Sequence, residues 1–412
     1  MYDSGTQHSC ADYARALRGD IPSEQFRRDL YRLAWLPVHL AIIALAVRFV
    51  LTSGSHGGRS LLVSAILGHS YGCLMFLAHE ILHGTIVKSA GWQNWLSGLC
   101  MLPYCIGPAH WKAWHNRAHH GHTSVSGSDP DSFGNVMMFM NNRVARFTLT
   151  FAPGSGYRRS YLFLGFWFSF HAIITLFIHG RRYDDSNGAR RSRQIALFFL
   201  MAGFWAAVLT LVGPARFLLI YVFPMVIANV LQMSYISTNH LFCDETEHVN
   251  DPLLNSLSVS VPRWVHWLHL NFGYHVEHHI FPFLSPRHAP RVRAAIEARY
   301  GRLYRNLPLM TALRVLYRTP PVHLSQNETV DLETGDVYQT LGERGELPHK
   351  IDRVPVPVRP RRRAVTRLHG CAPAVPLTDS HSTATVRCGQ LPAACAGRDA
   401  DAYDESSLNR AA

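Results

Sequence analysis

The sequence is poor in charged residues and lacks the cysteine pairs that mark small metal-binding folds. Charged residues make up 17% of its 412 residues, against about 25% in a typical soluble protein. None of the eight cysteines belongs to a Cys-x-x-Cys pair, so we expect neither a zinc-finger site nor a disulfide framework. The apolar residues are gathered in blocks, which predicts a membrane protein.

Acidic residues are the scarcer of the charged ones. The chain has 28 Asp and Glu against 40 Lys and Arg, a net charge of +12. Such a surplus suits either nucleic acid or an anionic membrane surface. Beside apolar blocks we favour the membrane and expect no nucleic-acid partner, because arginines that flank spans lie on the cytoplasmic side.

Five apolar runs are long enough to cross about 30 Å of hydrocarbon. They are residues 33–51, 60–78, 160–178, 195–212 and 217–236. Residues 92–107 are apolar but shorter, and Pro103 and Gly107 break them. We expect these residues to form a re-entrant or interfacial segment.

Nine histidines lie beside these runs, in three clusters and a singleton. They are His79 and His83; His115, His119 and His120; His240; and His275, His278 and His279. Imidazole stays neutral near pH 7 and suits redox iron. Residues four apart share a helix face, so His79 and His83 are expected to reach one metal site.

The two triples carry further expectations about direction. His115 and His119 are four apart and share a face, whereas His120 points about 100° away, so this triple can serve two ions. His275, His278 and His279 are expected on one helical face.

The positions of the triples decide which runs cross the membrane. If residues 115–120 and 275–279 serve one site, an even number of crossings separates them, although three runs lie between. Five arginines between residues 181 and 193 place that segment in the cytoplasm. We therefore predict that residues 160–178 form an interfacial helix. The resulting fold is all-α, with four transmembrane helices, a cytosolic helical cap and both termini cytoplasmic.

The sequence around the triples resembles the membrane fatty acid desaturase family. The resemblance is carried by AHWKAWHNRAHHGHT (residues 109–123) and NFGYHVEHHIFP (residues 271–282). The three boxes, H-x(3–4)-H, H-x(2–3)-H-H and (H/Q)-x-x-H-H, occur in order, and the resemblance covers about residues 35–300. It implies four spans, a cytosolic cap and a di-iron centre whose ligands are the nine histidines, with His240 the least certain.

Four carboxylates beside the boxes are candidates to support the ligands. Metal-bound histidines usually donate their other N–H to a carboxylate or carbonyl group. We expect this role for Glu80, Glu277, Asp129 and Asp131.

The function predicted from these features is O2-dependent desaturation of a fatty acyl chain, carried as acyl-lipid, acyl-CoA or acyl-carrier. No amino-acid side chain abstracts hydrogen from an unactivated methylene, and the resemblance implies that two iron ions supply the oxidant, with O2 as co-substrate. One alternative is a hydroxylase or ketolase of the same superfamily that acts on a lipid, alkane or carotenoid. A remote alternative is a His-rich metal transporter, which would place its histidines along a pore.

Electrons must come from a separate carrier. The chain has neither the His-Pro-Gly-Gly motif of the family's fused cytochrome b5 domains nor a cysteine pattern for an iron–sulfur cluster. A ferredoxin, rubredoxin or cytochrome b5 is therefore implied. The basic cap, with Arg287, Arg291 and Arg293, is a candidate docking face, although a solvated basic face is the simpler interpretation.

The sequence predicts three parts. Residues 1–32 are a polar lead, residues 33–318 form the membrane desaturase domain, and residues 319–412 show no apolar period. We expect this last part to be mostly disordered.

Overall fold

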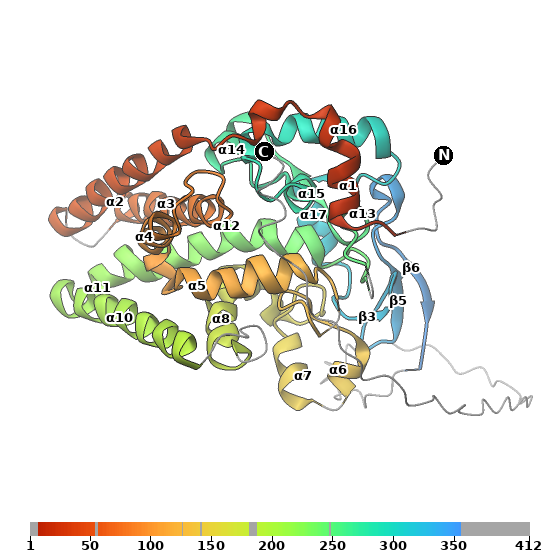
Figure 1. Ribbon diagram of the computed structural model, residues 1–412. Coiled ribbons are helices and arrows are strands. Elements are labelled where there is room, and N and C mark those ends of the chain that lie inside the picture. The colour runs from red at the N-terminus through yellow and green to blue at the C-terminus, as the bar shows by residue number, and fades with distance from the viewer. Residues whose placement is uncertain are drawn as a thin grey trace, which may run out of the picture. The chain divides into compact units, whose positions relative to one another are not determined.

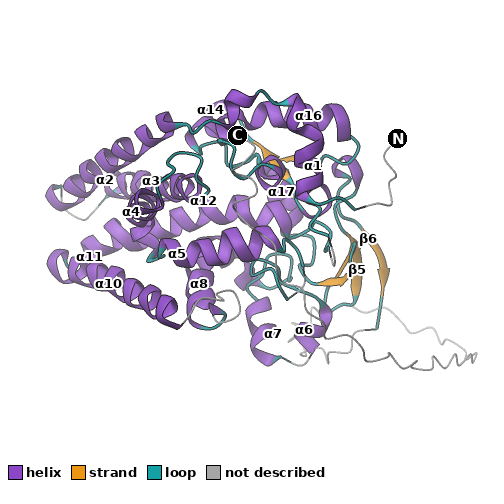
Figure 2. Ribbon diagram, in the orientation of Figure 1, coloured by secondary structure: helices purple, strands orange, loops and turns teal. Residues whose placement is uncertain are grey.

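The computed structural model describes residues 7–53, 57–125, 127–140, 142–180, 188–246 and 249–355. In this part of the chain helices predominate, as predicted, and the strands form two small sheets (Figures 1 and 2). Five helices are long and apolar enough to cross a membrane: Leu30–Thr52, Gly58–Leu82, Arg158–Phe177, Arg190–Val212 and Pro214–His240.

Helix α3 (Gly58–Leu82) is the inner helix of the apolar part. Its most apolar window is 67% buried, against 22% for the first candidate span and 11% for Arg190–Val212. Helices α2 (Trp35–Thr52) and α10 (Gly188–Val212) therefore carry mostly outward-facing apolar side chains, as lipid-facing helices do. Helix α3 packs against α2, α4 (Ala90–Met101) and α12 (Phe223–His240).

Two glycines one turn apart bring α3 close to α12. A Cβ atom on Gly68 would lie 2.4 Å from the Pro224 carbonyl oxygen, and one on Gly72 would lie 2.6 Å from Leu231 Cδ2. Small residues let helix backbones approach closely in a membrane, where apolar burial gives no driving force between helices.

Pro224 interrupts the hydrogen bonding at the start of α12. It has no N–H to donate to the Ile220 carbonyl, and the preceding turn, η7 (Leu218–Val222), is a π-helix. The Tyr71 hydroxyl of α3 donates to that carbonyl at 3.1 Å, and the Ser64 hydroxyl donates to the Leu219 carbonyl. An unpaired carbonyl group is costly in an apolar medium. The hydroxyl groups of α3 therefore supply hydrogen-bond donors where the proline provides none.

Helix α8 (Phe163–Phe177) is tied to other segments at both ends. At its N-terminal end the Tyr161 ring stacks on Tyr317, with centroids 5.5 Å apart. At its C-terminal end Arg191, near the start of α10, donates to the Phe177 carbonyl at 2.9 Å.

Short elements complete the described part of the chain. The helices are α1 (Cys10–Leu17), α5 (Pro108–Trp111), the π-helix η5 (Lys112–His119), α6 (Val136–Met140), α7 (Arg143–Leu149), α11 (Pro214–Phe217), α13 (Pro252–Asn255), α14 (Arg263–Leu268), α15 (His275–Ile280), α16 (Ala289–Tyr300) and α17 (Leu309–Leu316). Strand β1 (Ser258–Ser260) pairs in parallel with β2 (Asn306–Pro308). Shorter 3-10 turns lie at residues 18–20, 23–26, 30–34, 102–104, 158–162, 286–288 and 343–345.

Helix α1, within the predicted polar lead, packs against α15 and α16. Its Tyr13 and Leu17 are buried and share a core cluster with Val276 of α15 and Ile296 of α16. The polar composition of residues 1–32 concealed this, because only one face of so short a helix is apolar.

A four-stranded antiparallel sheet follows α17, in the order β3 (His323–Ser325), β4 (Glu328–Val330), β5 (Asp336–Gln339) and β6 (Lys350–Arg353). The expectations of an all-α fold and of disorder from residue 319 were wrong for this segment. Strands of three or four residues are too short to show a period of two, although Val330 and Val337 are buried. The remainder of the predicted tail, residues 356–412, lies outside the described residues.

Gly68→Ala is expected to destabilise the protein by about 1–3 kcal/mol, because the added methyl group overpacks the α3–α12 contact. The measurement is the thermal unfolding midpoint of the detergent-solubilised protein. Gly203→Ala in α10 is the matched control, because a Cβ there meets nothing within 4 Å. An unchanged midpoint for Gly68→Ala would contradict the close approach of the two helices.

Candidate metal centre

The nine histidines singled out in the sequence converge in two groups. The five-histidine group contains His79, His83, His115, His120 and His278, and the four-histidine group contains His119, His240, His275 and His279. Within each group the candidate ligand atoms all lie within 4.8 Å of one another.

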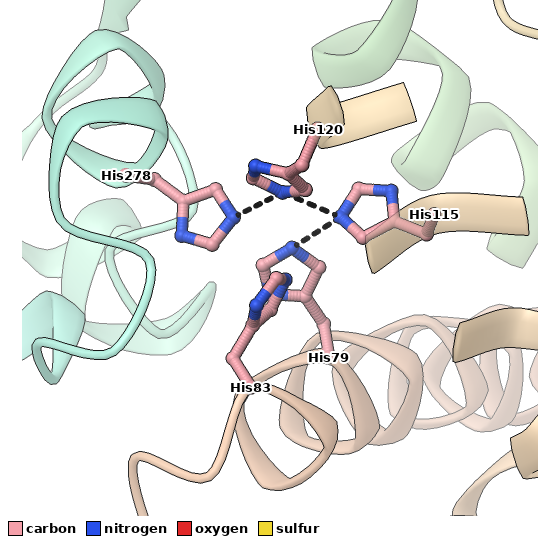
Figure 3. A group of neighbouring side chains, drawn as sticks. All are labelled: His79, His83, His115, His120 and His278. Atoms are coloured by element: carbon pink, nitrogen blue, oxygen red, sulfur yellow. Dashed lines mark hydrogen bonds between the residues drawn. The ribbon is translucent and has the colours of Figure 1, made fainter. Parts of the chain in front are cut away.

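The five-histidine group is built from α3, from the second-box helix (α5 and η5, residues 108–119, with His120 directly after it) and from α15. The five imidazole rings point toward a common centre (Figure 3). The Nε2 atom of His115 lies 3.1 Å from that of His79 and 3.2 Å from that of His120. His278 Nε2 lies 3.1 Å from His120 Nε2. The Nε2 atom of His83 is buried without a hydrogen-bond partner.

The four-histidine group is the more deeply buried, and none of its members is more than 6% exposed. The Nε2 atom of His275 lies 2.6 Å from that of His240 and 3.0 Å from that of His279.

The hydrogen bonds of the Nδ1 atoms, which face away from the centre of this group, show which ring nitrogens carry a proton. His240 Nδ1 lies 3.0 Å from the Asn255 carbonyl oxygen, which can only accept, so Nδ1 carries the proton. His119 Nδ1 likewise donates to Asp129 Oδ1 at 3.0 Å. In the neutral form of each ring, the inward Nε2 atom is then a bare lone pair.

Lone pairs that face one another need a cation between them. His275 Nε2 can donate one proton at most, which leaves one of its two contacts, to His240 or His279, without a proton unless an ion intervenes. Two nitrogens that bind one ion at about 2.0–2.1 Å lie about 2.9–3.4 Å apart. The observed separations of 2.6–3.2 Å lie in or just below this range, so the residues fit a metal ion in each group.

Burial keeps most of these rings in the neutral form that binds metals. Burial, followed by the neighbouring imidazoles, lowers the pKa of six of them well below the ordinary value; these are His83, His115, His120, His275, His278 and His279. His119 differs: burial lowers its pKa, but the carboxylates of Asp129 and Asp131 outweigh burial and raise it to about 9.

The second box, with His115, His119 and His120, divides its histidines between the two groups. An α-helix would place His115 and His119 on one face, but residues 112–119 form a π-helix, in which the His120 N–H donates to the His115 carbonyl. This wider turn brings His115 and His120 into the same group and directs His119 to the other. His115 and His119 also lie together with Asp131 in a third, smaller group of candidate ligands, and their rings stack with centroids 5.2 Å apart. The triple thus spans both histidine groups, as expected.

The third box also spans both groups, although we expected one face. His275 and His279, four apart on α15, share the four-histidine group, whereas His278 joins the five-histidine group. The first box behaves as expected, because His79 and His83 lie in one group.

Of the four carboxylates, two contact a candidate ligand. Asp129 and Asp131 lie 3.0 Å and 3.4 Å from His119 Nδ1. The expectation was wrong for Glu80, which instead pairs with Arg32 at 3.2 Å in a buried contact.

Glu277 anchors α15 instead of supporting a histidine. Its carboxylate accepts from the Ser258 hydroxyl at 2.6 Å and from the Tyr304 hydroxyl at 2.5 Å. Ser258 Oγ also accepts from the backbone N–H groups of His275 and Val276, both at 3.0 Å. A serine from β1 therefore caps the start of the third-box helix.

Thr123 is a supporting residue that the sequence analysis did not identify. Its hydroxyl donates to the His119 carbonyl at 2.8 Å and lies 3.4 Å from His279 Nδ1. Its own carbonyl accepts from the Asn255 amide at 3.0 Å and the Thr246 hydroxyl at 3.0 Å. Neither threonines nor asparagines in polar loops give a sequence signal for such a role.

The segment after His240 is held by the C-terminal sheet. The Leu341 N–H donates to the Phe242 carbonyl at 2.9 Å, and the Glu245 N–H donates to the Gln326 carbonyl at 2.8 Å. His323 Nε2 donates to the Cys243 carbonyl at 3.0 Å.

A separate pair of histidines lies outside the two groups. His69 Nε2 lies 3.2 Å from His269 Nε2, and the Tyr235 hydroxyl lies 2.7 Å from His269 Nδ1. The side chains of His69, His269 and Tyr235 thus form a hydrogen-bonded chain, which gives both histidines a structural role.

A small apolar pocket of about 30 Å³ borders the four-histidine group. His240, Asp131 and His171 are among its lining residues. The other lining residues are mainly aromatic or aliphatic: Trp114, Phe133, Phe163, Trp167, Phe168, Met233, Ile236, Ser237 and Leu241.

Comparison with known proteins agrees with this arrangement. A family model described as "Fatty acid desaturase" matches residues 59–308. The match covers more than half of the 412 residues and includes all nine histidines. The chain belongs to the fatty acid desaturase family.

One similar curated protein is the fatty acid desaturase 2-like protein FADS2B of Mus musculus. It is 22% identical to this chain over 281 residues, which cover 63% of the chain and 55% of the relative. The chain thus spans about half the length of this relative.

Proposed function

We propose that this protein is a membrane-bound, O2-dependent acyl desaturase that introduces a C=C bond at a centre of two iron ions. The observation that carries the proposal is the convergence of nine histidines in two adjacent groups. Family membership over residues 59–308 supports it.

The two groups would each hold one ion, and all nine histidines would be ligands. When bound, a pair of iron ions supplies the oxidising power that removing hydrogen from an unactivated methylene requires. The protein's own residues hold the rings: Asp129, the Asn255 carbonyl and Thr123 fix the outer nitrogens so that the inner ones remain free to bind.

The pocket beside His240 is the proposed place for the reacting part of the acyl chain. Its aromatic and aliphatic lining excludes water and favours an apolar substrate. An acyl chain of an acyl-lipid, acyl-CoA or acyl-carrier would pass one C–C bond beside the four-histidine group, where orientation contributes to the rate.

A separate carrier would deliver the electrons. The five-histidine group is the more accessible one, since His115, His120 and His278 are only partly buried. We propose that a ferredoxin, rubredoxin or cytochrome b5 approaches from this side. The exposed basic residues Lys88, Arg117 and Arg291 suit an acidic partner.

Hydroxylation or keto-group formation is the second candidate, because the same two groups would also serve a superfamily member with that chemistry. The aromatic pocket lining would accept a lipid, an alkane or a carotenoid. The metal-transporter alternative is disfavoured, because the nine histidines converge in two groups and do not line a pore.

For the membrane arrangement we propose four spans, with α8 lying along the interface and the metal groups and termini on the cytoplasmic side. Both ends of α8 support this. One end contacts Tyr317 of the cap, and the other contacts Arg191 at the arginine-rich start of α10. A helix with both ends at one level does not cross.

Cysteine labelling tests the span count. In sealed vesicles Lys88→Cys and Arg216→Cys should react with an impermeant maleimide from opposite sides. In the proposed arrangement Lys88 lies on the cytoplasmic side, and only α10 crosses the membrane between it and Arg216. Both positions are exposed. If α8 crossed as well, the two variants would be labelled from the same side; the unsubstituted chain gives the background.

Lipid analysis tests the reaction. Expression with a compatible electron carrier should give new double bonds by mass spectrometry, and the purified protein should hold about two iron ions per chain. His278→Ala and His279→Ala, one from each group, should each lose about one ion and the activity. His122→Ala, outside both groups, is the control. Hydroxylated or keto products would favour the second candidate, and an iron-free protein would refute both.

Phe163→Leu tests the pocket. Phe163 is 1% exposed and stacks on Trp167 with centroids 4.9 Å apart, so a smaller side chain extends the apolar end. We expect the preference among acyl chain lengths to shift toward longer chains by about tenfold. Product profiles from a mixture of chain lengths measure this. Phe170→Leu, on the exposed face of α8, should leave the profile unchanged; identical profiles for both variants would contradict the assignment.

A further inference from the structure

His171 connects helix α8 to the four-histidine group. Its Nε2 atom donates to Asp131 Oδ1 at 3.1 Å, and the side chain is 14% exposed. The sequence placed this residue on an interfacial helix and gave it no part in the site. A histidine inside an apolar helix was the available signal, since such residues are rarely idle.

Asp131 is held at its carboxylate by two side chains. Oδ1 accepts from Trp114 Nε1 at 2.9 Å and from His171 at 3.1 Å. Oδ2 lies 3.4 Å from His119 Nδ1. The direction of Oδ2 toward the candidate ligand therefore depends on what holds Oδ1.

The other carboxylate near His119 is fixed differently. Asp129 Oδ2 accepts from the Ser124 backbone N–H at 2.7 Å, and Oδ1 accepts from the Asp131 N–H at 2.9 Å. These backbone donors stay in place whatever happens on α8. Of the two carboxylates, Asp131 is thus the one that accepts a hydrogen bond from α8, in addition to the one from Trp114.

His171 also forms part of the pocket wall, together with Asp131 and His240. The same ring therefore meets the pocket on one side and the support of His119 on the other. This arrangement joins the proposed acyl site to the proposed metal site through one hydrogen bond.

We propose that His171 is a positioning residue for the four-histidine group: it holds Asp131 so that Asp131 fixes the His119 ring. The proposal rests on the proposed function, in which this group binds an iron ion. Loss of a partner that orients a metal ligand typically costs 10–100-fold in metal affinity. We expect a loss of about tenfold at the four-histidine group and no loss at the five-histidine group.

The test uses three variants of the full chain in detergent. His171→Phe keeps the ring shape and removes the donor, whereas His171→Gln keeps a donor near the position of Nε2. Ile173→Ala, on the exposed face of α8, is the control. Titration with Co2+ alone, followed by visible absorption, reports the affinity and ligand geometry of each site without turnover. His171→Phe should weaken one of the two sites, and His171→Gln should restore it.

A double-variant comparison separates positioning from general stability. Asp131→Asn should weaken the same site, and the Asp131→Asn, His171→Phe double variant should lose no more than Asp131→Asn alone. Additive losses would show that His171 does not act through Asp131. If the phenylalanine variant unfolds without metal, His171→Asn serves in its place, because its shorter amide does not reach Asp131.

The outcomes distinguish this inference from the proposed function. Two equally tight sites in His171→Phe and in the parent chain would overturn the role of His171 and leave the metal centre intact. A parent chain that binds neither Co2+ nor iron would refute the metal centre itself.

Discussion

The rest of the structure depends on one constraint: imidazole nitrogens of neighbouring histidines face one another, and there are too few protons to place one in every contact. Nine rings converge in two groups, and seven of them have an Nε2 atom 2.6–3.2 Å from that of another ring. Their lone pairs repel unless a cation lies between them. The outer nitrogens are therefore tied to fixed acceptors such as Asp129 and the Asn255 carbonyl.

The sequence identified which histidines come together but not how they divide. Box spacing sufficed for the first task, whereas the division depends on the π-helix over residues 112–119, which α-helical periodicity does not predict. The position of a carboxylate next to a histidine box in the sequence also did not predict which way its side chain points. Glu277 lies two residues from His275 and so points to another side of α15. His171 came from a segment that gave no box signal.

The long helices were predicted to within a few residues because their apolar runs are long. Residues 60–78 correspond to Gly58–Leu82, and residues 217–236 lie within Pro214–His240. The failures lie where segments are short. The strands between residues 323 and 353 and helix α1 each bury only a few side chains, so their pattern does not rise above the polar composition around them.

The C-terminal sheet lies beyond the residues that match the family model, but it packs against them. The match to the family ends at residue 308, before β3 begins. Yet the backbone partners of Phe242 and Glu245, just after His240, come from residues 341 and 326. The part of the chain that matches the family model is thus shorter than the part that packs together in the structure. The family's shared part is completed here by a piece of chain that lies outside it.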